Sequence, residues 1–63
     1  MPKTYNDIYF KIRNALRISG VEAYSLEARV LLAAAADKSK EALMRDLYLY
    51  TSDDIEKKAD EML

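Results

Sequence analysis

Residues 26–36 read LEARVLLAAAA, an unbroken series of helix-favouring residues in which only Glu27 and Arg29 are polar. Its apolar side chains cover nearly the whole circumference of a helix, and a helix that is apolar all round is a buried one. We therefore predict a central helix over residues 24–36, with Glu27 and Arg29 at its edge. The alanines would let neighbouring helices approach closely.

The segment before this helix carries the signals for another helix. Thr4-x-x-Asp7 has the spacing of a capping box at a helix N-terminus. Gly20 stands where a left-handed residue would end the helix. We predict a helix over residues 5–19, whose inward stripe is formed by Ile8, Ile12, Ala15 and Leu16.

Two shorter helices are predicted after the central one. Ser39 can cap a helix over residues 40–47, with Leu43, Met44 and Leu47 inward. The alternation at residues 48–50 then indicates an extended connector with Leu49 tucked in.

Thr51-x-x-Asp54 has the spacing of a second capping box, which opens a helix over residues 52–62. Its apolar positions are Ile55, Ala59 and Met62. No glycine, proline or polar tail follows it, and we expect this helix to continue in a longer protein.

The composition fits one small all-α four-helix bundle. The chain has 63 residues, one glycine, one proline and no cysteine or histidine, so disulfides and the usual zinc ligands are excluded. Ten basic and 11 acidic residues give no basic excess for nucleic acid. The longest apolar run, residues 30–36, is too short to span a membrane, and the N-terminus is unlike a signal peptide. We expect a soluble, cytoplasmic domain.

No residues suggest a catalytic, cofactor or metal site. A nucleophile–base pair usually needs histidine, and a phosphate cradle needs a glycine-rich loop. Asp53 and Asp54 fall in the first helical turn, where acidic side chains complement the helix dipole. Four lysines are interpreted as a solvated face: Lys38, Lys40, Lys57 and Lys58.

Two groups of residues are candidates for binding a partner. Phe10 lies away from the inward stripe of its helix, with Arg13 and Arg17 beside it, and aromatic and arginine side chains are enriched at protein interfaces. The simpler interpretation is that Phe10 packs on a neighbouring helix. Tyr48 and Tyr50 form the second group, and they can either anchor a partner or cover the edge of the bundle.

Three segments of the chain resemble a known domain. These segments are Leu16-x-x-x-Gly20-Val21-Glu22, Leu26-Glu27-Ala28-Arg29-Val30-Leu31-Leu32 and Asp37-Lys38-Ser39-Lys40. In this order they resemble the N-terminal domain of the HemK/PrmC-type release factor glutamine methyltransferases. Thr51-Ser52-Asp53-Asp54 fits the family's next helix start, so the resemblance covers residues 8–62.

The chain departs from the family pattern at three places. Ala23-Tyr24-Ser25 stands where the family often has Ser-Pro-Arg. Arg29 replaces a common glutamate, and Asp37 replaces the usual helix-ending glycine.

The resemblance implies a role in modifying a translation termination factor. Such enzymes transfer a methyl group from S-adenosylmethionine to the glutamine amide of the Gly-Gly-Gln motif in peptide chain release factors. Catalysis takes place in a Rossmann-like domain with an Asn-Pro-Pro-Tyr motif, which residues 1–63 lack. The chain would thus be the helical N-terminal domain, which helps to bind the release factor beside its own C-terminal methyltransferase domain.

Other functions fit the same pattern less well. A stand-alone helical protein-interaction module needs no partner domain. Carrier proteins are also small acidic four-helix bundles, but Tyr24-Ser25-Leu26 lacks the aspartate that precedes their modified serine. A helix-turn-helix DNA-binding domain is disfavoured because helix 40–47 carries Glu41 and Asp46.

Overall fold

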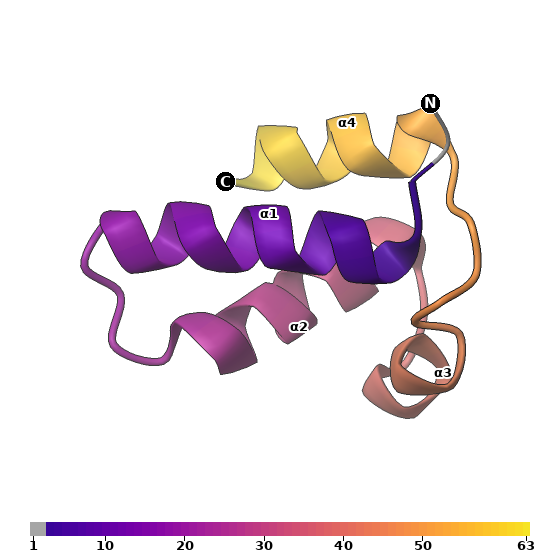
Figure 1. Ribbon diagram of the computed structural model, residues 1–63, viewed down its shortest axis with the longest axis horizontal. Coiled ribbons are helices and arrows are strands. Elements are labelled where there is room, and N and C mark those ends of the chain that lie inside the picture. The colour runs from indigo at the N-terminus through magenta and orange to yellow at the C-terminus, as the bar shows by residue number, and fades with distance from the viewer. Residues whose placement is uncertain (1–2) are drawn as a thin grey trace.

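Four helices account for most of residues 3–63, the part of the chain that the computed structural model describes. They are α1 (Tyr5–Ile18), α2 (Tyr24–Ala36), α3 (Lys40–Arg45) and α4 (Asp53–Met62) (Figure 1). α1 and α4 run side by side, and α3 lies at one end of the molecule. α2 packs against each of the other three helices, so the all-α class and the central position of 24–36 are confirmed.

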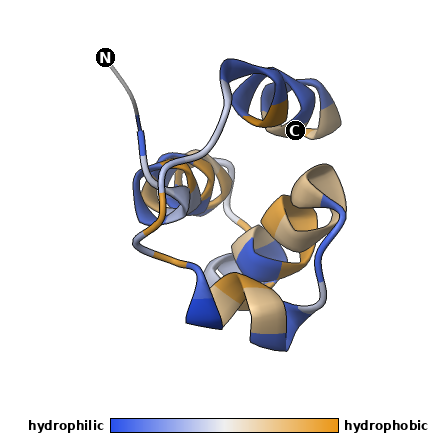
Figure 2. Cartoon of the chain, turned by 90° about the vertical axis from the view of Figure 1, so that its right-hand side faces the viewer, coloured by the Kyte–Doolittle hydropathy of each residue, from blue (hydrophilic) through white to orange (hydrophobic). Residues whose placement is uncertain are grey.

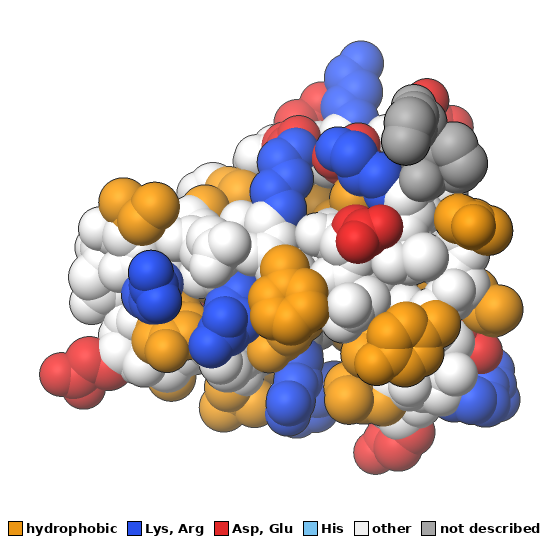
Figure 3. Space-filling model, viewed as in Figure 1, with side chains coloured by type: hydrophobic (Ala, Val, Ile, Leu, Met, Phe, Trp, Pro, Cys, Tyr) orange, Lys and Arg blue, Asp and Glu red, His pale blue; other side chains and the backbone are white. Residues whose placement is uncertain are grey.

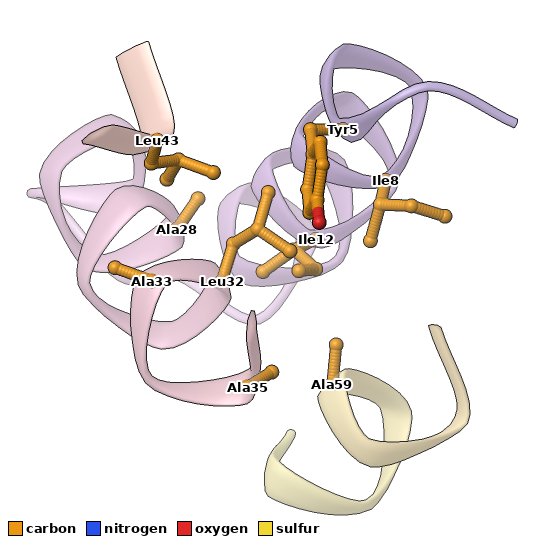
Figure 4. Packing of buried hydrophobic residues seen from close by; sticks show 9 residues of the cluster. All are labelled: Tyr5, Ile8, Ile12, Ala28, Leu32, Ala33, Ala35, Leu43 and Ala59. Atoms are coloured by element: carbon orange, nitrogen blue, oxygen red, sulfur yellow. The ribbon is translucent and has the colours of Figure 1, made fainter. Parts of the chain in front are cut away.

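The core is built around the contact between α1 and α2. Leu32 has no exposed surface and lies between the two helices, close to Tyr5 and Ile12 (Figure 4). Ala35 of α2 and Ala59 of α4 face one another where those helices meet. The other buried members are Ile8, Ala28, Ala33 and Leu43. Four of the nine buried side chains are therefore alanines.

The first helix begins and ends as its sequence predicts. The Thr4 hydroxyl accepts a hydrogen bond from the Asp7 amide at 3.2 Å, and the Thr4 amide donates to the Asp7 carboxylate at 2.9 Å. This is the reciprocal pattern of a capping box. α1 ends at Ile18, one residue before the predicted end, and Gly20 follows with φ +87°. A left-handed residue at this position favours glycine, which has no Cβ.

The outer side of α2 differs from the prediction. Leu26 is 51% exposed and Val30 is 46% exposed, because the other three helices leave that side of α2 uncovered. Figure 2 shows the contrast between the largely apolar α2 and the largely polar α4. Ala23 supplies no side-chain cap, whereas Asp37 ends α2 in the left-handed conformation at φ 55°. Aspartate tolerates this conformation better than most residues.

Two predictions for residues 46–50 are wrong: the end of α3 and the burial of Leu49. Ser39 caps α3 as predicted, but the helix ends at Arg45 rather than at residue 47. The carbonyls of Leu47 and Leu49 accept hydrogen bonds from the Asn6 and Tyr5 amides at 2.8 and 3.1 Å. These are first-turn amides of α1, which have no partner inside their own helix. The connector's backbone therefore faces α1, and the Leu49 side chain points outward, 58% exposed, instead of packing inside.

Met44 and Met62, both predicted to face inward, are also largely exposed. Leu43 and Ala59 fill the corresponding core positions on α3 and α4. Each short helix therefore contributes a single fully buried side chain.

The predicted second capping box is wrong in its residues. Ser52, not Thr51, caps α4, and its hydroxyl accepts from the Ile55 amide at 3.4 Å. The Thr51 amide donates to the Lys3 carbonyl at 2.8 Å, which aligns residues 50–51 with the segment before α1. This pairing turns the Thr51 hydroxyl into the protein, where none of residues 3–63 forms a hydrogen bond with it.

Ion pairs attach α4 to α1. Glu56 accepts from Lys3 at 2.6 Å and from Lys11 at 3.0 Å, and Lys11 also pairs with Asp60 at 3.0 Å. The pKa of Glu56 is lowered by these two lysines. α4 also packs against the core through Ala59 and Ile55, so the exposed ion pairs add to an apolar contact.

Lys38 is not part of a solvated lysine face. Its ammonium lies 2.9 Å from an Asp46 carboxylate oxygen and 5.5 Å from the centre of the Tyr5 ring. Arg45 also pairs with Asp46 at 3.0 Å. Asp46 therefore links the end of α3 to the loop before it.

Within residues 3–63, no helix has both the length and the apolar character needed to cross a membrane.

We expect Leu32→Ala to lower the free energy of unfolding by about 3 kcal/mol, because it leaves a cavity at a fully buried site. A domain of this size has a total stability of only about 3–5 kcal/mol, so the variant should keep no more than about 2 kcal/mol and a measurable fraction of it should be unfolded without urea. Urea denaturation followed by circular dichroism measures both. Leu26→Ala makes the same change on the exposed side of α2 and should cost less than about 1 kcal/mol. Equal losses in the two variants would contradict this assignment of the core.

Acid should weaken the link at Asp46. Arg45 and Lys38 lower the pKa of this carboxyl from 3.8 to about 2. A group with a lowered folded-state pKa stabilises the fold above its unfolded pKa and loses that contribution as the pH falls through the folded value. We expect Asp46→Asn to be less stable than the parent at pH 7, and the difference to disappear as the pH falls from 3.8 to about 2. Urea titrations across this range measure it.

Glu61→Gln is the matched control for this titration, because Glu61 is exposed and forms no ion pair within residues 3–63. A stability difference for Asp46→Asn that did not change with pH would show that the ion pairs contribute nothing.

Candidate functional site

The three predicted residues of α1 lie on one solvent-facing side of the helix. Phe10 is 46% exposed, Arg17 is exposed and Arg13 is half-buried. Phe10 is neither in the core nor among the side chains that pack against it. Its ring instead lies against Tyr9, with the two centres 5.5 Å apart and the planes tilted by 57°.

Arg13 is held in place by residues of both helices. Its guanidinium carbon is 5.8 Å from the centre of the Phe10 ring and 5.0 Å from that of Tyr24. These distances are within the range of cation–π attraction. Its Nε also donates a hydrogen bond to the Ser25 hydroxyl at 3.1 Å. The side chain therefore has a defined orientation although part of it faces solvent.

A small hollow lies further along the same junction. It has a volume of about 90 Å³. Its walls come from α1, α2, α3 and the start of the connector, and its lining is formed by Tyr9, Arg29, Leu43, Met44 and Leu47. The lining is almost entirely apolar apart from Arg29. The volume is below the ~150 Å³ of a cavity that binds benzene, so the hollow suits an aliphatic side chain rather than a cofactor.

The surroundings of Arg13 and the hollow lie one helical turn apart and form one surface. Tyr9 precedes Arg13 by one turn of α1, and Arg29 follows Ser25 by one turn of α2. We call this surface the α1–α2 seam and define it by Tyr9, Phe10, Arg13, Arg17, Arg29 and Met44. Figure 3 shows hydrophobic and basic side chains next to one another on one face of the molecule.

The arginines of the seam differ from the cations of the chain that form ion pairs. Lys3, Lys11, Lys38 and Arg45 each pair with a carboxylate of the chain itself. Between residues 3 and 63, Arg13, Arg17 and Arg29 form no ion pair. The seam is thus a positively charged, partly apolar surface whose charges the fold does not neutralise.

The predicted tyrosines form a separate feature on the connector. Tyr48 is 77% exposed and Tyr50 is 72% exposed. They therefore do not cover the edge of the bundle. The hydrogen bonds between the connector backbone and α1 fix this segment with both rings directed outward.

Sequence reasoning missed the α2 and α3 parts of the seam. Arg29 was assigned to the edge of its helix, and Met44 to the core. A signal was available in the spacing of Ser25 and Arg29 on one side of α2, but the register of α2 against α1 was needed to place them beside Arg13 and Tyr9.

The remaining polar residues offer little chemistry. Asp53 and Asp54 are exposed in the first turn of α4, where the sequence placed them. Ser25, the only match to a carrier-protein attachment site, is half-buried and accepts the hydrogen bond from Arg13. α3 has six residues and carries Glu41, which is unfavourable for a DNA-reading helix. No group of three or more acidic side chains in residues 3–63 is arranged to hold a metal ion.

Comparisons of the chain with protein-family models, with curated proteins and with solved structures gave no match.

Phe10→Ala should leave the fold intact. Because Phe10 lies outside the core, we expect its loss to change the free energy of unfolding by less than about 1 kcal/mol. Tyr9→Ala removes the adjacent ring, which is half-buried and packs against the core, and should cost about 2 kcal/mol. Urea denaturation of the two variants tests this difference. A larger loss for Phe10→Ala would mean that Phe10 is part of the core.

Proposed function

We propose that the chain is the substrate-docking domain of a cytoplasmic release factor glutamine methyltransferase. The observation that carries the proposal is the exposed Phe10 ring beside an oriented Arg13, on a solvent-facing surface of α1. Aromatic and arginine side chains dominate the binding energy of many protein interfaces. The choice of a peptide chain release factor as the partner comes from the resemblance of the motifs, in their order, to the family's N-terminal domain.

The residues of this chain do not fit the cofactor of such an enzyme. S-adenosylmethionine is bound in the family by a glycine-rich loop of a Rossmann-like sheet, whereas residues 3–63 form no sheet and contain one glycine. The seam hollow of about 90 Å³ is also too small for this molecule. The proposal therefore assigns methyl transfer to a separate catalytic domain and gives this chain no chemical step.

Docking would act on the reaction through position. Contacts made far from the reacting atoms can hold a substrate in the orientation that the transition state requires, which lowers the entropic part of the barrier. Phe10 and Arg13 suit this role because their orientation is set before the partner arrives. Side chains that are already ordered lose less entropy on binding.

Tyr48 and Tyr50 are the second contact of the proposal. Their rings are large, rigid and exposed, and tyrosine loses little conformational entropy when it is buried in an interface. A partner that covered both the seam and the connector would extend across α1 and α3.

Titration of the chain with a peptide chain release factor, measured by calorimetry, tests the proposal. We expect the chain to bind, and Phe10→Ala and Arg17→Glu to weaken binding by about tenfold or more each. Met62→Ala and Lys58→Glu are the matched controls, because they remove an exposed apolar side chain and reverse an exposed charge on α4. Absence of binding by the parent chain would refute the proposal, and equal affinity of the Phe10 and Arg17 variants would remove the seam from it.

A further inference from the structure

The seam combines two features that define the chemistry of a ligand. The first is the hollow between Tyr9, Leu43 and Met44, which is apolar and open to solvent at one side. The second is the set of three arginines that no carboxylate of residues 3–63 neutralises. Arg29 belongs to both features, because it lines the hollow and is itself exposed.

Arg13 has hydrogen-bond donors that the fold does not use within residues 3–63. Arg13 uses only its Nε within the part of the chain described, in the hydrogen bond to Ser25. The nearby Phe10 and Tyr24 rings, whose centres lie 5.8 and 5.0 Å from the guanidinium carbon, help to hold this group in position. A planar guanidinium with free terminal nitrogens matches the two oxygens of a carboxylate.

We propose that the α1–α2 seam binds an acidic amphipathic segment of a protein partner. One aliphatic side chain of that segment enters the hollow, and carboxylates on the same side pair with Arg13, Arg17 and Arg29. The inference rests on the proposed function in one respect, since both require the seam to be a protein-binding surface, but it fixes the chemistry of the partner rather than its identity.

Charge complementarity selects a carboxylate-bearing segment over other anions. The seam is locally positive, whereas the chain as a whole has a net charge of −1. Nucleic acid would be attracted by the same arginines, but it has no aliphatic side chain to place in the hollow. The lining of the hollow is almost entirely apolar, so it offers few polar groups to a phosphate but can hold the apolar anchor residue of a peptide.

The spacing of the seam fits a helical segment. Arg13 and Arg17 are four residues apart on α1, so their side chains are one helical turn apart on the surface. A partner helix with an anchor residue and glutamates three, four and seven positions away would place its carboxylates along this row.

The test uses three synthetic helical peptides with the 63-residue chain. The first has one leucine anchor with glutamates at those positions, the second replaces the glutamates with glutamines, and the third replaces the leucine with alanine. Binding is measured by fluorescence anisotropy, with circular dichroism to verify the fold of each protein variant. We expect the second and third peptides to bind about tenfold more weakly than the first.

Variants of the chain assign the effect to the arginines. Arg17→Glu and Arg29→Glu should each weaken the acidic peptide by about tenfold, while Lys58→Glu, with the same change in net charge on α4, should leave its affinity unchanged. A peptide with lysine in place of one glutamate should regain affinity for Arg29→Glu. Merely structural damage could not produce that rescue.

The outcomes separate this inference from the proposed function. A release factor that binds with equal affinity to the parent and to Arg29→Glu, together with no preference for the acidic peptide, would overturn the inference and leave the docking function standing. Binding of the acidic peptide without binding of release factor would refute the docking function and leave the inference standing. Tighter binding of a single-stranded oligonucleotide than of the acidic peptide would also overturn the inference.

Discussion

The close packing of α1 against α2 around Leu32 is the contact on which the other elements depend. Leu32 is completely buried, and Ile8 and Ile12 supply the facing surface from α1. Buried alanines along α2 keep the backbones near enough for these side chains to interlock. α3 and α4 each add one fully buried side chain, so most of the core comes from α1 and α2.

Backbone hydrogen bonds, more than side-chain burial, position the segment between α3 and α4. The first turn of α1 has amides that no residue of its own helix can satisfy, and the carbonyls of residues 47 and 49 accept from them. This requirement ends α3 early and turns the side chains of residues 48–50 toward solvent. The exposed tyrosines are therefore a consequence of how α1 begins.

Seven of the ten basic residues of the chain fall into two groups with different roles. Lys3, Lys11, Lys38 and Arg45 pair with carboxylates and attach the peripheral parts of the fold to the core. Arg13, Arg17 and Arg29 lie on the remaining side and stay unneutralised by residues 3–63. A small domain with few buried side chains gains orientation from the first group, while the second group gives one surface its positive charge. We propose that this surface serves a protein partner.

The sequence by itself determined the four helices, the caps at Thr4 and Ser39 and the inward stripe of α1, because these depend on local spacing and on hydrogen bonds within a few residues. It also placed Phe10, Arg13 and Arg17 together on one side of a helix. Only the tertiary structure decided that Leu26, Val30 and Leu49 are exposed, that Ser52 rather than Thr51 caps α4, and that Arg29 and Met44 meet Tyr9 at a hollow. Those features depend on the register between helices and on which side of each helix finds a neighbour, and local pattern does not encode either.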